Sequence, residues 1–321
     1  MSSRRLASGW TRSAFLLRGT SVALAVGILS TGQMGAAIGK VLRQHGADVI
    51  TCLEGRSEAT AARAREAGIR EVETLDDVVR QARLVLSVLV PAEAVGLAER
   101  LARAAKRTHA RPVFAECNAI APAAVARIAA VMEGAGVHTI DAGIIGPPPN
   151  PGQHATRIYC SGPDTGPLLA LGGLGLDIRP VGPEIGQASG LKMVYAASTK
   201  GTTALWTELM AAARALGLED ALVDEFTLGR AAIARALIGE IPSMPRKSRR
   251  WVGEMEEIAA TFEALGLTPR MLQGAADMFR LVGGTPLADP AAKRPEPTLD
   301  ETLNAVVEAL PKRAPASAKT S

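Results

Sequence analysis

The chain has 321 residues, of which 47% are hydrophobic and 21% charged, so it is a globular chain long enough for two domains. Aromatic residues make up only 3%, which argues against stacking platforms for single-stranded nucleic acid. The net charge is +4, but seven cations lie in the acid-free ends 1–20 and 311–321, so the body between them carries −3. We therefore expect no nucleic-acid partner.

The two ends are predicted to lie outside the folded part. Residues 1–20 are rich in Arg and Ser, which is typical of a transit-like segment, and a start assigned too far upstream is the alternative. The last eleven residues, 311–321, are predicted to be disordered. No uninterrupted apolar run is long enough to span a bilayer, so we expect a cytoplasmic protein without a membrane partner.

The cysteines and histidines do not indicate a metal site. Cys52, Cys117 and Cys160 are far apart and form no C-x-x-C pair, which favours small buried thiols in a reducing compartment. The four histidines show no metal-ligand spacing, so no metal is predicted.

In chain order, the first 160 residues alternate between apolar runs and helical spacing. The run 22–29 predicts a strand buried on both faces, and further strands are expected at 48–53, 84–90, 112–117, 138–145 and 156–162. Helices are expected at 34–45, 57–68, 93–105 and 121–136, with Ser57 as an N-cap and Pro122 opening the last of them. This alternation predicts a Rossmann-type, doubly wound parallel α/β sheet over residues 21–183.

The pattern changes after Pro183. From Ile185 to Leu310 no strand is indicated, and long Ala- and Leu-rich segments have helical spacing. We expect an all-α domain over 184–310 that serves substrate binding and dimerisation. The basic stretch PRKSRRW (245–251) is interpreted as a solvated loop between helices, with a substrate-anion site as the alternative.

The stretch VGILSTGQMG (26–35) resembles a dinucleotide-binding turn with one glycine replaced. Gly32 supplies the position at which backbone approaches pyrophosphate, and Gly35 supplies close helix packing. Ser30 replaces the first glycine, which is tolerable if its φ is negative. A P-loop is excluded because GAAIGK has too few residues between its glycines. The predicted cofactor contacts here are Leu29, Ser30, Thr31, Gly32, Gln33, Met34 and Gly35.

The end of the second strand offers features for both nicotinamide cofactors. Glu54 suits a ribose 2′-hydroxyl, as in NAD sites, whereas Arg56 beside Ser57 at a helix N-terminus suits a 2′-phosphate. We favour NADP, and NAD stays open with Glu54 as the ribose ligand.

Four segments, in order, resemble the β-hydroxyacid dehydrogenase and 6-phosphogluconate dehydrogenase superfamily. They are VGILSTGQMG, FAECNAIAP (114–122), DAGIIGPP (141–148) and GQASGLKMVYAA (186–197). The later RWVGEMEEIAATFEALGLTP resembles the branch with a DUF1932-type C-terminal domain, whose members are NAD(P)-dependent oxidoreductases. The resemblance implies a hydride-transferring enzyme, a homodimer, Lys192 as its general acid/base, and further cofactor contacts at Leu89, Val90 and Asn118.

The chemistry of Lys192 also follows from its surroundings. Hydride transfer from an alcohol needs a base for the hydroxyl proton, and desolvation would lower a lysine pKa into the useful range. Lys192 stands in an apolar stretch at the head of the second domain. The alternative is a surface lysine that extends its amine to water.

The substrate pocket departs from the family pattern. Tyr195-Ala196 stands in place of an asparagine pair, Asn118-Ala119 in place of Ser-Thr, and Ile145-Gly146-Pro147 in place of Ser-Gly-Gly. Thr199 and then Lys200 occupy the place of a glutamate, so oxidation of a sugar phosphate with decarboxylation is not expected. The predicted substrate contacts are Asn118, Ala119, Gly143, Ile145, Gly146, Tyr195, Thr199 and Lys200.

These observations predict an oxidoreductase that transfers a hydride between NADP(H) and a small β-hydroxyacid or a related alcohol or carbonyl compound. Two alternatives stay open. The first is an imine reductase on the same scaffold, which the retained Lys192 disfavours. The second is a dinucleotide-binding sensor that lost its chemistry together with the asparagine pair.

Overall fold

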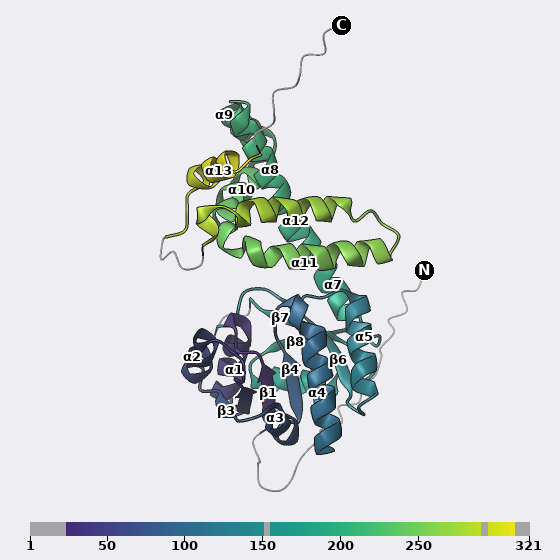
Figure 1. The fold of residues 1–321 in the computed structure, drawn as a ribbon. Coiled ribbons are helices and arrows are strands. Elements are labelled where there is room, and N and C mark those ends of the chain that lie inside the picture. Colours follow the sequence, from purple (N-terminus) through teal and green to yellow (C-terminus); the bar gives the residue numbers. More distant parts are fainter. Residues whose placement is uncertain (1–23, 151–154, 290–294, 312–321) are drawn as a thin grey trace, which may run out of the picture.

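The computed structural model describes residues 24–150, 155–289 and 295–311 (Figure 1). The predicted extension 1–20 lies outside these residues, as does the predicted tail 311–321 apart from Pro311. Eight strands form one sheet in the order β3-β2-β1-β4-β5-β6-β7-β8. The strands are β1 Ala25–Leu29, β2 Asp48–Cys52, β3 Arg70–Val72, β4 Leu84–Ser87, β5 Val113–Glu116, β6 Thr139–Ile145, β7 Arg157–Ser161 and β8 Asp177–Gly182.

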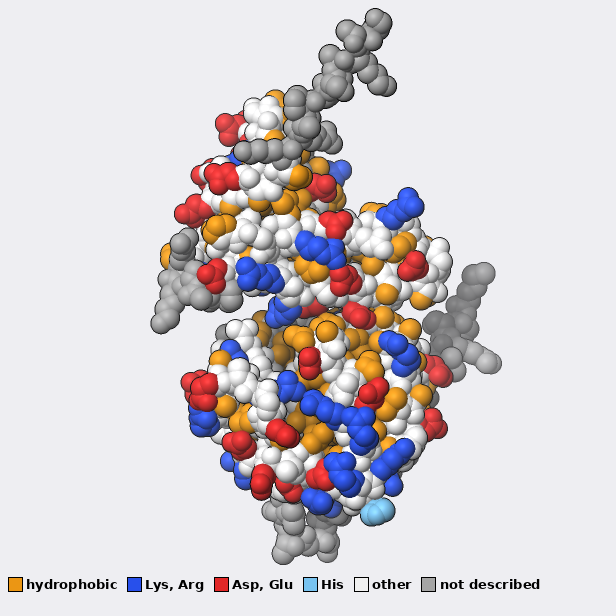
Figure 2. Space-filling model, in the orientation of Figure 1, with side chains coloured by type: hydrophobic (Ala, Val, Ile, Leu, Met, Phe, Trp, Pro, Cys, Tyr) orange, Lys and Arg blue, Asp and Glu red, His pale blue; other side chains and the backbone are white. Residues whose placement is uncertain are grey.

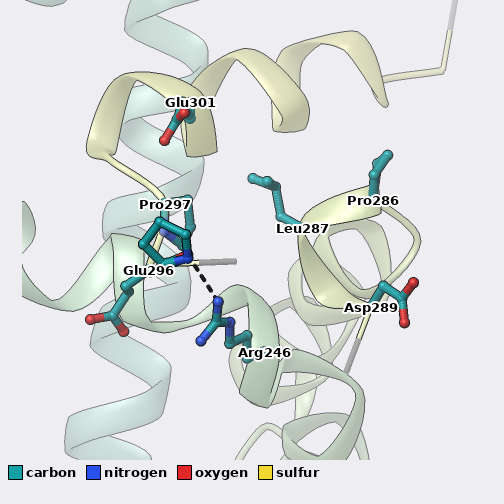
Figure 3. Close-up of a pocket in the computed structure, with 8 residues that line it drawn as sticks. Arg246, Pro286, Leu287, Asp289, Glu296, Pro297 and Glu301 are labelled. Atoms are coloured by element: carbon teal, nitrogen blue, oxygen red, sulfur yellow. Dashed lines mark hydrogen bonds between the residues drawn. The ribbon is translucent and has the colours of Figure 1, made fainter. Parts of the chain in front are cut away.

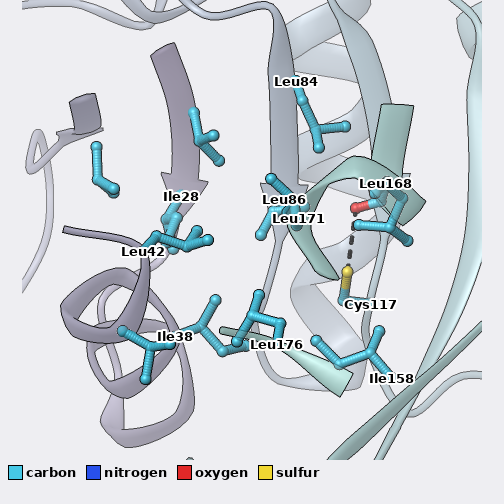
Figure 4. Packing of buried hydrophobic residues seen from close by; sticks show 14 of the residues in the cluster. Ile28, Ile38, Leu42, Leu84, Leu86, Cys117, Ile158, Leu168, Leu171 and Leu176 are labelled. Carbon is cyan, nitrogen blue, oxygen red and sulfur yellow. Dashed lines mark hydrogen bonds between the residues drawn. The ribbon is translucent and has the colours of Figure 1, made fainter. Parts of the chain in front are cut away.

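Helices cover both faces of this sheet, as predicted for a doubly wound domain. One face packs against α1 (Gln33–Gln44), α2 (Glu58–Glu66) and α6 (Gly166–Leu169), where Ile38, Leu42 and Leu168 meet Ile28 and Leu86 (Figure 4). The other face packs against α3 (Leu75–Gln81), α4 (Ala94–Thr108) and α5 (Pro122–Glu133). Burial from both sides explains why the central strands are continuous apolar runs.

Local signals in the sequence set several helix ends. The Ser57 side chain accepts from Thr60 N at 3.3 Å and caps α2, and Pro122 occupies the first turn of α5, both as predicted. Thr74 forms a capping box with Asp77 at the start of α3, a helix that the apolar spacing did not indicate.

The sheet differs from the prediction in three respects. The strand expected over 84–90 ends at Ser87, since Leu89 N donates to the Asn118 side chain and Pro91 begins the short 3₁₀ helix η1 (Pro91–Glu93). The short strands β3 and β8 were not predicted. β7 runs antiparallel to β6, whereas every other neighbouring pair is parallel.

The second part of the chain is helical, and no strand follows Gly182 within the described residues. α7 (Gln187–Ala196) continues through a π-helical turn, η3 (Ala197–Gly201), into α8 (Thr202–Ala215), so that one long helix joins the two domains (Figure 1). Around it lie α9 (Glu219–Gly229), α10 (Ala231–Ser243), the antiparallel pair α11 (Pro245–Ala264) and α12 (Arg270–Gly283), and α13 (Leu299–Glu308).

The interpretation of residues 245–251 as a loop between helices is wrong. Pro245 is the first residue of α11, and only Met244 separates this helix from α10. Proline is favoured in the first turn of a helix, where its missing N–H costs nothing. The basic residues of this stretch therefore have fixed positions on a helix.

Candidate active site

The sheet order reverses between β1 and β4, since the later strands continue away from β1 on the β4 side. At such a switch point the loops that follow the two strands diverge and leave a crevice at the carboxyl ends. The structure brings Ser30–Gly32, Leu89 and Val90 to this edge. Ser30 N donates to Val88 O at 3.3 Å, which fixes the two loops to each other.

The two glycines of the first loop differ in their surroundings. A Cβ on Gly35 would lie 2.1 Å from Ser30 O, so only glycine permits α1 to pack this closely on the loop. A Cβ on Gly32 would meet no atom within 4 Å, and its φ of −65° suits any residue. Ser30 is not among the described residues with positive φ, which explains why serine is accepted there.

The start of α1 fits the pyrophosphate of a dinucleotide. Gly32 is the N-cap, no side chain caps the helix, and its first turn contains no acidic residue. The first N–H groups of a helix and its dipole together favour an anion, and the missing Cβ of Gly32 leaves room for one. Of the other predicted contacts, Gln33 is exposed, Met34 is half-buried, and Leu29 and Thr31 are buried.

The loop after β2 lies beside this helix start. Thr31 Oγ1 donates to Thr60 O at 3.2 Å, which ties the dinucleotide loop to the first turn of α2. Glu54 is exposed and Arg56 half-buried, and a turn through Gly55 (φ +70°) separates them. Arg56 and Ser57 therefore lie at the N-terminus of α2, next to the loop that would hold the cofactor.

Asn118 connects the loops that follow β4 and β5. Its Oδ1 accepts a short hydrogen bond from Leu89 N, and its Nδ2 donates to Ser87 Oγ at 2.8 Å. The backbone of Asn118 also donates to Glu116 Oε1 at 2.9 Å. The residue is 2% exposed, so in this structure its side chain shapes the loop against which a cofactor or substrate would lie.

Glu116 ends β5 and is fully buried. Its Oε1 is held by Asn118, whereas Oε2 has no hydrogen-bond partner within the described part of the chain. Burial raises the pKa of this carboxyl to about 7, against the opposing effect of its hydrogen bonds with Asn118 and Ser87.

A buried carboxylate attaches the long interdomain helix to the sheet. Asp141 Oδ2 accepts from Gly186 N at 2.9 Å, Ser189 N at 3.0 Å and Ser161 Oγ at 3.0 Å, and so caps the start of α7. Two residues along β6, a Cβ on Gly143 would lie 3.1 Å from Lys192 Cβ. Gly143 thus lets α7 lie directly on the sheet and places Lys192 at its carboxyl edge.

Lys192 is half-buried at this junction. Burial lowers the pKa of its amine to about 8, and the positive charge of Lys200 acts in the same direction. The carboxylates of Glu254 and Glu116 oppose the shift. An amine with this pKa exchanges a proton near neutral pH.

Lys200 projects from the π-helical turn toward α11. Its Nζ lies 2.8 Å from Glu254 Oε2 and 5.8 Å from the centre of the Trp251 ring. Arg250 Nε lies 3.3 Å from the other oxygen of Glu254. Burial acts to raise the pKa of Glu254, but the charges of Lys200 and Arg250 outweigh it, so the pKa is lowered and the carboxyl is ionised.

The remaining predicted substrate residues are placed less uniformly. Ala119 packs against the apolar cluster of the helical domain that contains Met193. Ile145 is buried at the end of β6, and Gly146, with φ +118°, lies against Ala155 O. Thr199 is exposed, and Tyr195 is 47% exposed on the outer side of α7. Only Gly143 and Lys200 are thus tied by these contacts to the surroundings of Lys192.

Three carboxylates were not predicted as site residues: Glu116, Asp141 and Glu254. Glu116 and Asp141 carry a detectable signal, since each is the only acid in an apolar strand, and a buried carboxylate requires partners. Glu254 carries no such signal, because it is one of several glutamates in a helical stretch. Its partner Lys200 belongs to η3, so the pairing cannot be read from the local sequence.

Two cavities lie away from this edge. One, of about 150 Å³, is lined only by residues of the helical domain, where Arg246 donates to Pro295 O at 2.9 Å (Figure 3). The other is at the amino ends of the strands, beside Leu24, Leu84 and Val113. The described residues contain no group of three or more metal-ligating side chains, and none of their helices is long and apolar enough to cross a membrane.

Comparison with known families divides the chain in the same way. Residues 25–165 match the NAD binding domain of 6-phosphogluconate dehydrogenase, and residues 213–282 match DUF1932, a domain of unknown function. The first match places the glycine loop and Asn118 inside an NAD-binding domain.

Solved structures share this fold. A conserved protein of unknown function, described as structurally similar to 3-hydroxyacid dehydrogenases, is 30% identical, with a TM-score of 0.63 over 81% of this chain and 98% of that one. The 3-hydroxyisobutyrate dehydrogenase of Mycobacterium tuberculosis is 19% identical, with a TM-score of 0.64 over 89% and 98%. An imine reductase from Myxococcus stipitatus in complex with NADP⁺ is 18% identical, with a TM-score of 0.53 over 80% and 92%.

The last two likenesses concern the fold, whereas the relative at 30% identity also shares the sequence over nearly its whole length. The chain therefore belongs to the family of 3-hydroxyacid dehydrogenase-like proteins that join an NAD-binding domain of the 6-phosphogluconate dehydrogenase type to a DUF1932 domain.

Proposed function

We propose that this protein is an NADP-preferring oxidoreductase that interconverts a small β-hydroxyacid, or a related alcohol, with its carbonyl form. The observation that carries the proposal is the position of Lys192. Its amine, with a pKa lowered to about 8, projects from a helix that rests on Gly143 at the same sheet edge as the dinucleotide loop.

Lys192 is the residue that moves the proton. When bound, the cofactor supplies the hydride acceptor or donor. Neutral Lys192 takes the proton of the substrate hydroxyl during oxidation, and protonated Lys192 returns it to the carbonyl oxygen during reduction. Gly32 and the start of α1 bind the pyrophosphate, and Asn118 fixes the loop with Leu89 and Val90 beside the cofactor.

The preference for NADP is supported by Arg56 and Ser57. A guanidinium next to a helix N-terminus suits a dianionic 2′-phosphate, and α2 supplies that N-terminus. Glu54 is exposed and can turn its carboxylate to solvent, away from this phosphate. Because Arg56 supplies the positive charge, an Arg56→Ala variant should lose most of the discrimination between NADPH and NADH.

The reaction class is testable with a panel of substrates. The purified protein is assayed with NADP⁺ or NAD⁺ on 3-hydroxyacids and plain alcohols, and with NADPH on the matching 3-oxoacids and on cyclic imines. We expect turnover of a hydroxyacid and its oxoacid. Turnover of imines alone would favour the imine reductase, and cofactor binding without turnover of any compound would favour the sensor.

We further propose that the protein acts as a homodimer. Along α7, α8 and the C-cap residue of α8, six apolar residues are between 39% and 72% exposed, and a row of this kind is typical of an interface. These residues form the outer stripe, which consists of Leu191, Val194, Tyr195, Leu205, Leu209 and Leu216. A second copy covers this stripe in the proposed dimer.

A further inference from the structure

The loops that the family resemblance assigns to substrate binding offer little to an acid group in this chain. The Asn118 side chain is engaged by Leu89 N and Ser87 Oγ, and Ala119 faces an apolar cluster. Ile145 has no polar side-chain atom and is buried. Among these described side chains, an anionic substrate would therefore find no charged or free polar partner.

The opposite wall, formed by η3 and α11, is rich in cations. Lys200 and Arg250 hold the two oxygens of Glu254, and Lys247 Nζ lies 5.7 Å from the centre of the Trp251 ring on the same helix. Two cations thus pair with one carboxylate, and Lys247 adds a third positive charge on the same helix. Figure 2 shows Lys and Arg side chains over α11 and at its border with the sheet domain, with Asp and Glu side chains among them.

This wall is held in place from both domains. Trp251 packs edge to face on fully buried Phe279, with ring centres 5.2 Å apart, so the platform beneath Lys200 is rigid. Glu257, one turn after Glu254, accepts from Ala121 N of the sheet domain at 2.7 Å. The Lys200 side chain is only 17% exposed, which means that its amine is directed by these contacts and not by solvent.

Lys200 also lies on the same side of the long helix as Lys192. The two are eight residues apart, about 12 Å along a helix axis, and both amines interact with Glu254. Two lysine side chains that extend toward each other can bring their amines to opposite ends of a small molecule bound between them. One amine then reaches the reacting hydroxyl and the other reaches a group a few bonds away.

We propose that Lys200, supported by Arg250, is the receptor for the carboxylate of the substrate on the helical side of the site. Glu254 is a positioning residue that holds both cations in place before substrate binds. The inference rests on the proposed function, since it concerns the same site, and it assigns recognition of the acid group to a side chain of the helical domain.

Binding of malonate is a test that does not depend on turnover. Isothermal titration of malonate into the protein saturated with NADP⁺ should show binding that is weakened about ten- to hundredfold in Lys200→Met, since a charge-assisted hydrogen bond is lost. Arg249→Met is the matched control, because it also removes one positive charge. The Arg249 side chain lies on α11 and donates to Gly283 O, so it is engaged away from Lys200. This control should bind malonate like the wild type.

A kinetic readout separates a receptor from a residue that only joins α11 to the long helix. For 3-hydroxyisobutyrate the KM should rise at least about tenfold in Lys200→Met, whereas for its methyl ester kcat/KM should stay unchanged. A structural role would affect both compounds equally. Glu254→Gln should give a smaller rise in KM for the acid.

The outcomes that overturn the inference differ from failure of the proposed function. Equal malonate affinity in wild type and Lys200→Met, or an equal loss in the Arg249→Met control, contradicts a receptor at Lys200. A wild type that turns over the ester as well as the acid also contradicts it. Absence of any turnover overturns the proposed function instead, and leaves the malonate comparison decisive for Lys200.

Discussion

At the scale of single residues, Lys192 determines how activity depends on pH. Its pKa of about 8 means that the neutral base needed for oxidation accumulates above pH 8, and the acid needed for reduction below it. We predict that kcat/KM for oxidation rises through pH 8 and that kcat/KM for reduction falls through the same range. Steady-state rates between pH 6 and pH 10 in both directions measure this, and profiles that rise together would contradict it.

The protonation of Glu116 couples the stability of the fold to pH. Its pKa is raised in the folded state, so its contribution is full at low pH and is lost as pH rises from 4.5 through about 7. The free energy of unfolding of the wild type should therefore fall by roughly 2–3 kcal/mol between pH 4.5 and pH 8 through this group, and we predict that Glu116→Gln abolishes this fall.

Urea unfolding at these two pH values measures the effect. Glu99→Gln is the control, because Glu99 is an exposed glutamate of α4. An equal pH dependence in wild type and Glu116→Gln would show that the carboxyl is not buried in this way.

At the scale of elements, the turn from β1 into α1 separates two glycine roles. Gly35→Ala places a methyl group 2.1 Å from Ser30 O and should destabilise the fold by about 1–3 kcal/mol. Gly32→Ala meets no protein atom within 4 Å, so its free energy of unfolding should change by less than about 0.5 kcal/mol.

For cofactor binding we expect the larger effect at Gly32, although the larger effect on stability is expected at Gly35. Because the new methyl group of Gly32→Ala fills the space proposed for pyrophosphate, NADPH affinity should fall on the order of tenfold. Thermal unfolding and NADPH titration of the two variants measure both effects. A Gly32→Ala protein that binds NADPH like the wild type would place the pyrophosphate elsewhere.

How far the sequence predicts each element depends on whether its signal is local. α1, α2 and α5 begin at a glycine, a serine and a proline that act within one turn, and these helices were predicted with nearly correct bounds. β3 has three residues and two of them are exposed, so it has no apolar run to detect. The antiparallel direction of β7 is a property of sheet pairing, which no local pattern encodes.

The candidate site follows the same rule. Gly32, Gly35 and Lys192 lie in motifs that can be recognised along the chain. The contacts of Glu254 with Lys200 and Arg250 depend on how α11 lies against η3, and the cap of Asp141 on α7 joins residues 45 and 48 positions apart. Packing between distant segments decides these contacts, so they could not be predicted.

At the scale of the whole molecule, the outer stripe predicts the state of association. Leu205→Glu combined with Leu209→Glu places two charges in the proposed interface and should convert the dimer to a monomer of 33.3 kDa. Light scattering after size exclusion measures the mass. Leu228→Glu is the control, since Leu228 is 85% exposed on α9 outside the stripe. A wild type that is monomeric at micromolar concentration would contradict the dimer.

The central claim is that the carboxyl edge of the sheet at β1 and β4 binds a nicotinamide cofactor and that Lys192 moves the proton there. Its most direct test is Lys192→Ala, assayed for NADPH binding and for turnover of the hydroxyacid that the wild type accepts. We predict unchanged NADPH affinity and a loss of kcat of about 10²–10⁴-fold, the usual contribution of a general acid or base. Turnover equal to that of the wild type would contradict the account.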